Sequence, residues 1–278
     1  MGKSITLKSH EELQFMWQAN RIVVEVLTFI KKNVTAGTNT WQLDRWAEEI
    51  ARSRGSIPAF KGYRGYPASL CVSLNEEVVH GIPSKKMIIK EGDIVSIDFG
   101  VAYQGYYGDA AITIGVGKID PGKAKLMRIT QEALYSGIEM AVVGNRVDDI
   151  SRAVQNHVEK HGYTVVRQFV GHGIGTALHE GPEVPNYISG VRGVRLQPGM
   201  VLAIEPMVNM GKHDVVVTND GWTVVTTDGK PSAHFEHSVA VTENGPLILT
   251  EMGSQETISN IFLTREKKVS WPKKRQYR

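Results

Sequence analysis

The chain has 278 residues, of which 41% are hydrophobic and 22% are charged, a composition that excludes a wholly disordered protein. Its single cysteine, Cys71, excludes an intrachain disulfide framework, and no apolar run is long enough for a signal peptide or a membrane span, so we expect a cytoplasmic protein. The net charge of +3 is uneven, because residues 261–278 carry seven Lys or Arg and one Glu, whereas the rest of the chain is mildly acidic.

The predicted elements follow the same order twice along the chain. Apolar residues at helical spacing predict a long helix over residues 11–34, and shorter helices are predicted over 43–54 and 147–161, each ended by a glycine. An irregular segment rich in Gly, Tyr and Pro is expected within residues 58–79. Strands are predicted over residues 69–74, 92–101, 108–116, 164–169, 200–208, 215–217, 223–226 and 234–242. Segregated helices and mostly antiparallel strands predict an α+β fold.

A shift of 107 residues superimposes the two copies of this order. It aligns Gly37 with Gly144, Gly55 with Gly162, Gly92 with Gly199, and Asp98 with Glu205. A second acid follows in each copy, Asp109 and Glu236, with about twenty extra residues in the second. The register predicts two similar halves, about residues 10–118 and 122–245, in a single domain over residues 1–255, followed by a flexible basic extension over 256–278. Chance overlap of common Gly and Val/Ile patterns is the alternative.

Asp98 and Asp109 are expected to meet across a hairpin. A reversal centred on Tyr103 and Gln104 would place the two Asp directly opposite each other, with Cβ atoms roughly 4.5–5.5 Å apart. Two ionised carboxylates at that distance repel strongly unless a cation lies between them, so the pair indicates a divalent metal ion. A protonated acid pair, or a register that leaves both Asp on the surface, is the alternative.

Further candidate ligands follow in the second half. Glu205 and Glu236 add two carboxylates, and His172 lies between glycines that allow close approach of the backbone. One histidine with a majority of oxygen ligands suits a dinuclear site for manganese, iron or cobalt, whereas structural zinc would favour cysteines.

These motifs together resemble the type I methionine aminopeptidases of the short, bacterial kind, over about residues 4–250. The resemblance rests on the sequences around His80 (Asn-Glu-Glu-Val-Val-His-Gly-Ile-Pro), Asp98 (Asp-Phe-Gly), Asp109 (Gly-Asp), His172 (Gly-His-Gly-Ile-Gly), His179 (His-Glu), Glu205 (Ile-Glu-Pro) and Glu236 (His-Phe-Glu-His). It implies the pita-bread fold, in which pseudo-twofold halves share a central antiparallel sheet flanked by helices.

The resemblance also implies roles for individual residues. Two divalent metal ions (Co²⁺, Mn²⁺, Fe²⁺ or similar) would be held by Asp98, Asp109, His172, Glu205 and Glu236. Glu205 would accept the proton of the nucleophilic water, His179 would stabilise the developing oxyanion, and His80 would contact the substrate amide. The methionine side chain would be received by Phe60, Tyr63, Tyr66, Cys71, Leu178 and Trp222. Phe60 and Leu178 depart from the Cys and Phe common in bacterial relatives, and we expect them to alter the pocket's shape but not the reaction.

The expected activity is removal of the initiator methionine from nascent polypeptides, with preference for a small second residue, by a monomeric enzyme. A proline-specific aminopeptidase or prolidase with the same ligands is one alternative, and a non-catalytic pita-bread protein that binds peptides or RNA is another. The basic tail is compatible with contact to a polyanion such as the ribosome surface.

Overall fold

The computed structural model describes residues 5–251 and 276–277 of the chain. Most of the predicted basic extension, and the predicted domain boundary after residue 255, lie outside the described residues. Residues Gln276–Tyr277 form β17, which pairs antiparallel with β1 (Ile5–Thr6). Among the described residues, no helix is both long and apolar enough to cross a membrane.

An antiparallel nine-stranded sheet forms the centre of the molecule. Its path runs through β2 (Ile57–Pro58), β5 (Ile94–Tyr103), β6 (Tyr106–Gly115), β15 (Glu236–Thr242), β10 (Val201–Ile204), β8 (Gly171–Gly173) and β9 (Glu180–Val184), with β3 (Cys71–Leu74) also on β5 and β16 (Gly245–Ile248) also on β15. The two halves of the chain meet where β6 pairs with β15. The predicted α+β class with a central antiparallel sheet is confirmed.

Two smaller sheets of three strands each complete the β structure. One contains β14 (Ser232–His234), β11 (Met207–Asn209) and β7 (Thr164–Val165), and the other contains β12 (Val215–Val217), β13 (Val224–Thr226) and β4 (Glu77–Val79). A single turn of 3-10 helix, η1 (Tyr63–Gly65), lies in the Gly- and Tyr-rich segment that was expected to be irregular.

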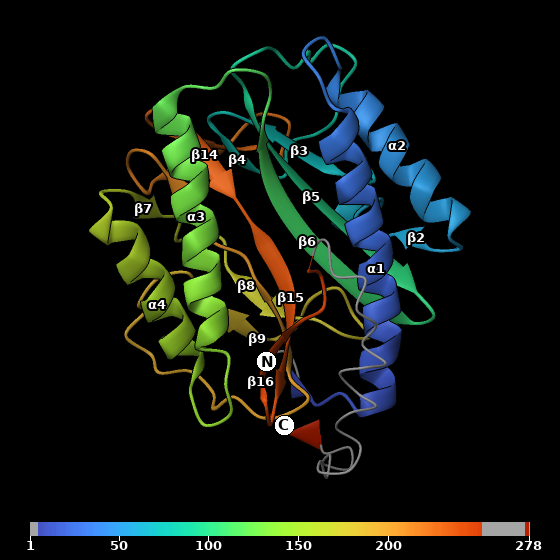
Figure 1. The fold of residues 1–278 in the computed structure, drawn as a ribbon, viewed down its shortest axis with the longest axis vertical. Coiled ribbons are helices and arrows are strands. Elements are labelled where there is room, and N and C mark those ends of the chain that lie inside the picture. Colours follow the sequence, from blue (N-terminus) through green and yellow to red (C-terminus); the bar gives the residue numbers. More distant parts are fainter. Residues whose placement is uncertain (1–4, 252–275, 278) are drawn as a thin grey trace.

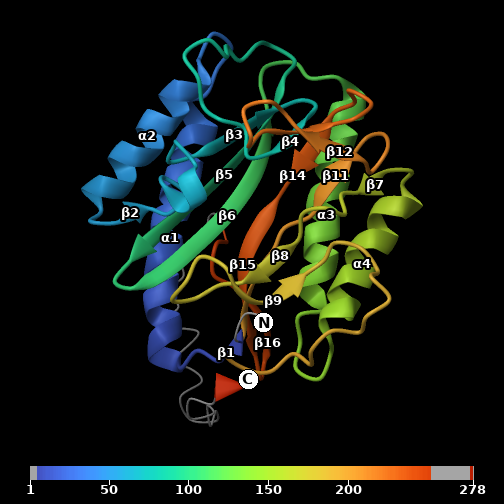
Figure 2. The same ribbon diagram turned by 180° about the vertical axis from the view of Figure 1, so that it is seen from behind.

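Two pairs of helices flank the sheet, one pair for each half (Figures 1 and 2). The first pair is α1 (His10–Asn33) with α2 (Thr40–Ser53), and the second is α3 (Pro121–Glu139) with α4 (Val147–Lys160). Helix α1 begins at Ser9, whose side chain and that of Glu12 form a reciprocal capping box. Helix α3 begins after Asp120, whose carboxylate accepts hydrogen bonds from the first backbone N–H groups of the helix.

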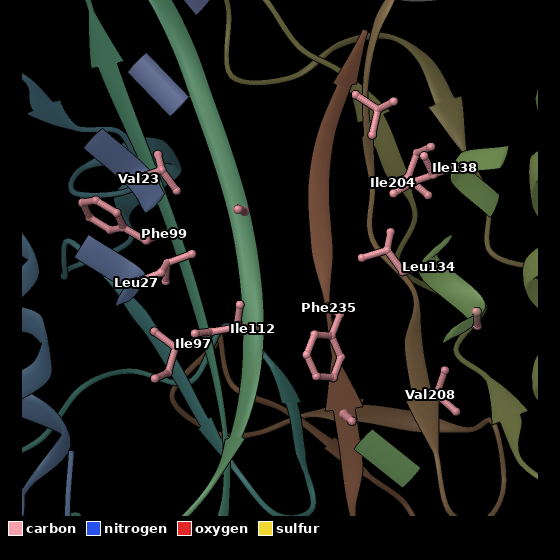
Figure 3. Close-up of a cluster of buried hydrophobic side chains, with 14 of the residues drawn as sticks. Val23, Leu27, Ile97, Phe99, Ile112, Leu134, Ile138, Ile204, Val208 and Phe235 are labelled. Atoms are coloured by element: carbon pink, nitrogen blue, oxygen red, sulfur yellow. The ribbon is translucent and has the colours of Figure 1, made fainter. Parts of the chain in front are cut away.

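One hydrophobic core runs through both halves between the helices and the sheet. Figure 3 shows Val23 and Leu27 of α1 beside Phe99 of β5, and Leu134 of α3 beside Ile204 of β10. Since successive side chains of a strand point to opposite faces, packing of Ile97 and Phe99 on the helix side directs Asp98 to the other face.

The two halves repeat each other at the predicted shift of 107 residues. Helix α2 maps onto α4 residue for residue, and Gly37 and Gly144 share a φ of 95°. The isolated bridge Asn39–Ile88 also recurs as Arg146–Arg195. The predicted pseudo-twofold arrangement is therefore confirmed in backbone detail.

The halves differ where the second carries its extra residues. Strand β5 is continuous through Asp98, whereas the corresponding stretch is divided into β10 and β11 around Glu205 and Pro206. Proline lacks the N–H group that a strand ladder needs, and this accounts for the break in the predicted strand 200–208. The inserted residues form β12 and β13, which pair with each other, and β13 also pairs with β4 of the first half.

The predicted register of the β5–β6 hairpin is wrong by two residues. The loop consists of Gln104 and Gly105, both with positive φ, as a two-residue turn with right-handed strand twist requires. Asp98 therefore lies opposite Ala111, and Asp109 lies opposite Gly100. An even shift keeps a side chain on its original face, so both carboxylates still project from the same side of the sheet as diagonal neighbours.

Candidate metal centre

Strands from both halves bring carboxylates together on the sheet face opposite the core. Asp98 and Asp109 come from β5 and β6, Glu205 follows β10, and Glu236 begins β15. Gly100 leaves room for its neighbour, because a Cβ atom there would lie 3.1 Å from Oδ1 of Asp109.

His172 is fixed on β8 by close packing of the backbone on both sides of it. A Cβ atom at Gly171 would lie 2.3 Å from the carbonyl oxygen of Ala203, and one at Gly173 would lie 2.0 Å from that of Gly181, so only glycine fits. The Nδ1 atom of His172 lies 3.0 Å from the carbonyl oxygen of Gly173, to which it can only donate. That hydrogen bond leaves Nε2 as the coordinating atom.

The acids are buried without full hydrogen bonding. Among the described residues, Oδ1 of Asp98, Oδ1 of Asp109 and Oε1 of Glu236 are buried and have no hydrogen-bond partner. Burial raises the pKa of Asp98 to about 7. Burial first, and neighbouring carboxylates second, raise the pKa values of Asp109, Glu205 and Glu236 well above their usual range.

A divalent cation fits this arrangement of side chains. One ligand atom from each of Asp109, His172 and Glu236 lies within 4.8 Å of the others, and Nε2 of His172 lies 3.5 Å from Oε1 of Glu205. A buried cation would neutralise the carboxylates and supply partners for their orphaned oxygens. One imidazole among oxygen ligands suits manganese, iron or cobalt better than the thiolate-rich sites that structural zinc prefers.

All of the site residues predicted from the sequence line one cavity of about 260 Å³. They are Phe60, Tyr63, Tyr66, Cys71, His80, Asp98, Asp109, His172, Leu178, His179, Glu205, Trp222 and Glu236. The carboxylates and His172 lie in the same cavity as the aromatic and apolar side chains, so a ligand in it would touch both groups.

The aromatic part of the cavity is held by hydrogen bonds and ring contacts. The Tyr66 hydroxyl contacts the carbonyl oxygens of Leu70 and Gly81 at 3.1 and 2.9 Å, and its ring meets the Trp222 ring edge-on at 5.1 Å. The Tyr63 hydroxyl lies 2.7 Å from Nδ1 of His179. The walls are thus set by the fold before any ligand enters.

His80 lies in the cavity with a strained backbone and a buried ring. Its φ of 62° is rare for a residue with a side chain, and such strain is found mostly at functional positions. The ring packs edge-on against Phe169 and Trp222, with centroids 5.4 and 6.3 Å away. Burial lowers the pKa of His80 to about 4, so the imidazole is neutral at pH 7.

His234 also lines the cavity, although it was not among the site residues predicted from the sequence. It is buried, and its Nε2 atom lies 3.8 Å from Oε2 of Glu205. Burial first, and then His80, lower its pKa to about 3. The sequence contains a signal that could have identified His234. It precedes Glu236 by two residues, and residues two apart in an extended chain direct their side chains to the same face.

Comparisons with known proteins identify the family of the chain. The model of metallopeptidase family M24 matches residues 14–243. A methionine aminopeptidase of Clostridium acetobutylicum is 51% identical over 246 residues, which are 88% of this chain and 98% of that protein. The crystal structure of a methionine aminopeptidase from Thermotoga maritima superimposes with a TM-score of 0.87 at 48% identity, covering 89% of this chain and 99% of the other.

More distant structures share the fold alone. A prolidase from Pyrococcus furiosus superimposes with a TM-score of 0.73 at 24% identity, and the match covers 89% of this chain but 66% of that one. The methionine aminopeptidases match this chain at higher identity than the prolidase does, and each match covers nearly the whole of both chains. The chain belongs to metallopeptidase family M24 and, within that family, to the methionine aminopeptidases.

Proposed function

We propose that the chain removes the initiator methionine from nascent polypeptides at the cavity between its two halves, with preference for a small second residue. The observation that carries the proposal is the set of buried carboxylate oxygens of Asp98, Asp109 and Glu236 that have no hydrogen-bond partner among the described residues, in a cavity that also contains His172. Such oxygens are costly to bury unless a cation binds them.

Two divalent ions would be held by Asp98, Asp109, His172, Glu205 and Glu236. When bound, such ions polarise a carbonyl group and make water nucleophilic at neutral pH. Glu205 lies in the break between β10 and β11, and its two oxygens lie 3.5 and 3.8 Å from Nε2 of His172 and of His234. A carboxylate held between imidazoles at the edge of the cavity is suited to accept the proton that the attacking water loses.

Two histidines are placed to contact the peptide bond. If the Tyr63 hydroxyl donates to Nδ1 of His179, the proton of that ring resides on Nε2, which can donate to the carbonyl oxygen as negative charge develops. Neutral His80 can donate one hydrogen bond to the substrate amide without bringing a positive charge near the metal ions.

The remaining walls suit an unbranched, sulfur-containing side chain. Tyr66, Cys71 and Trp222 provide a buried, mainly apolar surface, and thioether sulfur packs favourably against aromatic rings. Phe60 and Leu178 are also buried there, and we expect these two departures from the residues common in bacterial relatives to alter the shape of the pocket.

Three finer proposals accompany this function. The ions are manganese, iron or cobalt, the enzyme acts as a monomer in the cytoplasm, and the basic residues 256–278 contact the ribosome. The donor set supports the first proposal, and the charge of the tail supports the last.

The test is cleavage of two peptides, Met-Gly-Met-Met and Ala-Pro-Ala, by metal-stripped protein before and after addition of Mn²⁺, Fe²⁺ or Co²⁺. Asp109→Asn removes one proposed ligand charge with little change of shape, and Glu139→Gln is the matched control at an exposed acid. We expect metal-dependent release of methionine from the first peptide by the wild type and the control, and loss of at least a hundredfold in Asp109→Asn, a typical order for residues of a catalytic site.

Cleavage of the proline peptide alone would assign the chain to the proline-specific activity. Cleavage of neither peptide with any of the metals would overturn the proposed reaction and favour a binding protein.

A further inference from the structure

A second group of metal-binding side chains lies on the outer surface of α3 and α4. Glu132 comes from α3, His157 from the last turn of α4, and His161 directly follows α4. One ligand atom from each lies within 4.8 Å of the others, and all three side chains are half-buried. None of these residues lines the cavity described above.

The hydrogen bonds around His161 direct one nitrogen into the group. Its Nδ1 atom lies 2.8 Å from the carbonyl oxygen of His157. A carbonyl oxygen can only accept, so Nδ1 carries the proton and Nε2 presents a lone pair. The two imidazole rings lie close, with centroids 4.8 Å apart.

The contact with Ser136 favours the same tautomer for His157. The Ser136 hydroxyl donates to the carbonyl oxygen of Glu132 at 2.9 Å, so it can only accept from Nδ1 of His157, 3.5 Å away. Nε2 of neutral His157 then presents a lone pair to Oε2 of Glu132 at 3.2 Å. Two acceptors at that distance repel each other unless a cation or a proton lies between them.

We propose that Glu132, His157 and His161 bind a borderline divalent cation of the zinc class, which ties α4 to α3. The bond lengths of zinc support this choice, because two nitrogen or oxygen ligands about 2.0–2.1 Å from a tetrahedral ion lie roughly 3.3 Å apart. The observed separation of 3.2 Å between His157 and Glu132 already matches that spacing. A water molecule would complete the coordination.

Supporting contacts orient the carboxylate of Glu132. Arg128 binds the other oxygen, Oε1, at 2.6 Å, one helical turn away. This ion pair occupies Oε1 and leaves Oε2 directed toward His157. Partners of this kind fix a ligand's orientation at metal sites.

The test is a count of zinc ions in the full-length, manganese-loaded protein after equilibrium dialysis against Zn²⁺. The wild type is compared with the double variant His157→Gln/His161→Gln, with Glu132→Gln, and with His213→Gln as a control at a half-buried histidine outside the group. Any zinc that binds in the cavity should do so equally in all of these proteins. The difference in the number of zinc ions bound per chain therefore measures binding at the surface site.

We expect the wild type and His213→Gln to bind one more zinc ion per chain than the double variant, and Glu132→Gln to bind that ion roughly tenfold more weakly or worse. Added zinc should also raise the Tm of the wild type more than that of the double variant, because an ion that binds only the folded state stabilises it. Methionine release by the manganese-loaded double variant should be unchanged, which separates this site from the proposed function.

Equal zinc counts and equal Tm shifts in the wild type and both variants would overturn the proposal and assign the contact to a proton shared between His157 and Glu132. If the double variant fails to fold, Glu132→Gln decides the question, because it replaces a single surface carboxylate.

Discussion

Tyr63 influences the proposed reaction mainly through its contact with His179. Donation from its hydroxyl to Nδ1 of His179, 2.7 Å away, would select the tautomer that donates from Nε2. In the proposed reaction Tyr63 would therefore be a positioning residue with respect to the peptide carbonyl, in addition to forming part of the pocket wall.

Replacement of Tyr63 by Phe should lower kcat more than it changes KM. Loss of one hydrogen bond worth about 0.5–1.5 kcal/mol corresponds to a roughly two- to twelvefold fall in kcat. Steady-state kinetics on a Met-Gly peptide would measure it, with Tyr187→Phe as control because Tyr187 does not line the cavity. An unchanged kcat would contradict the positioning role.

The raised pKa values of the buried acids predict that metal binding releases protons. Burial raises the pKa of Asp98 to about 7, so this carboxyl is partly protonated at pH 7 in the metal-free site, and burial also raises the pKa values of Asp109 and Glu236 well above their usual range. A metal ion must displace these protons, so apparent affinity should rise with pH, about tenfold per unit for each proton released.

Calorimetric titration with Mn²⁺ at pH 6.5 and 7.5, in buffers of different ionisation enthalpy, would count the protons. We expect more protons released at pH 6.5 than at pH 7.5. Equal affinity at the two pH values, with no dependence on the buffer, would show that the acids are already ionised in the metal-free protein.

At the scale of elements, a buried ion pair attaches the N-terminal segment to the loop that carries His179. Lys8 follows β1, and its ammonium contacts Glu180 at the start of β9 and Thr6. The other carboxylate oxygen of Glu180 accepts from the backbone N–H groups of Thr176 and Ala177, at 2.8 and 3.3 Å. This arrangement orders the loop just before Leu178 and His179.

Replacement of Glu180 by Gln should destabilise the protein by about 3–5 kcal/mol, because the buried ammonium of Lys8 would lose its counter-charge. Urea unfolding would measure the loss. The double variant Lys8→Met/Glu180→Gln should recover part of it, since no charge is then left buried. If the double variant were no more stable than Glu180→Gln alone, the unpaired Lys8 ammonium would not be the cause of the lost stability.

The sequence predicted elements well where local signals were strong. Helices α1, α2 and α4 were found within three residues at each end, because apolar spacing and terminal glycines mark them. The predicted hairpin register was wrong because the sequence did not identify Gln104 and Gly105 as the turn residues. Their positive φ angles are visible only in the structure. Strands β8 and β9 were missed because they have no alternating apolar pattern, and are held instead by long-range pairing of β8 with β10 and of β9 with β8.

At the scale of the molecule, the candidate site joins the two halves. Asp98 and Asp109 come from the first half, and His172, Glu205 and Glu236 come from the second. The site residues could be proposed from the sequence because they lie in recognisable motifs. Their placement in one cavity could not, since it depends on the pairing of β6 with β15, strands more than a hundred residues apart.

Metal binding should therefore stabilise both halves together. We expect the Tm to increase with the concentration of free Mn²⁺, as it does for any ligand that binds only the folded state. We also expect tertiary and secondary structure to be lost in a single transition. Scanning calorimetry and circular dichroism with and without chelator would test it, with Asp109→Asn as the control that loses most of the shift. Two separate transitions in the metal-loaded protein would show that the halves unfold independently.

The repeated architecture has a consequence for the origin of the enzyme. If the halves arose by duplication of one gene, the ancestral polypeptide contained only half of the present cavity, and it could have built a complete one only as a homodimer. Fusion then freed each copy to change alone. The strand break at Glu205 and Pro206 is such a change, because the corresponding Asp98 lies within the continuous strand β5. It gives Glu205 a backbone environment that Asp98 never acquired.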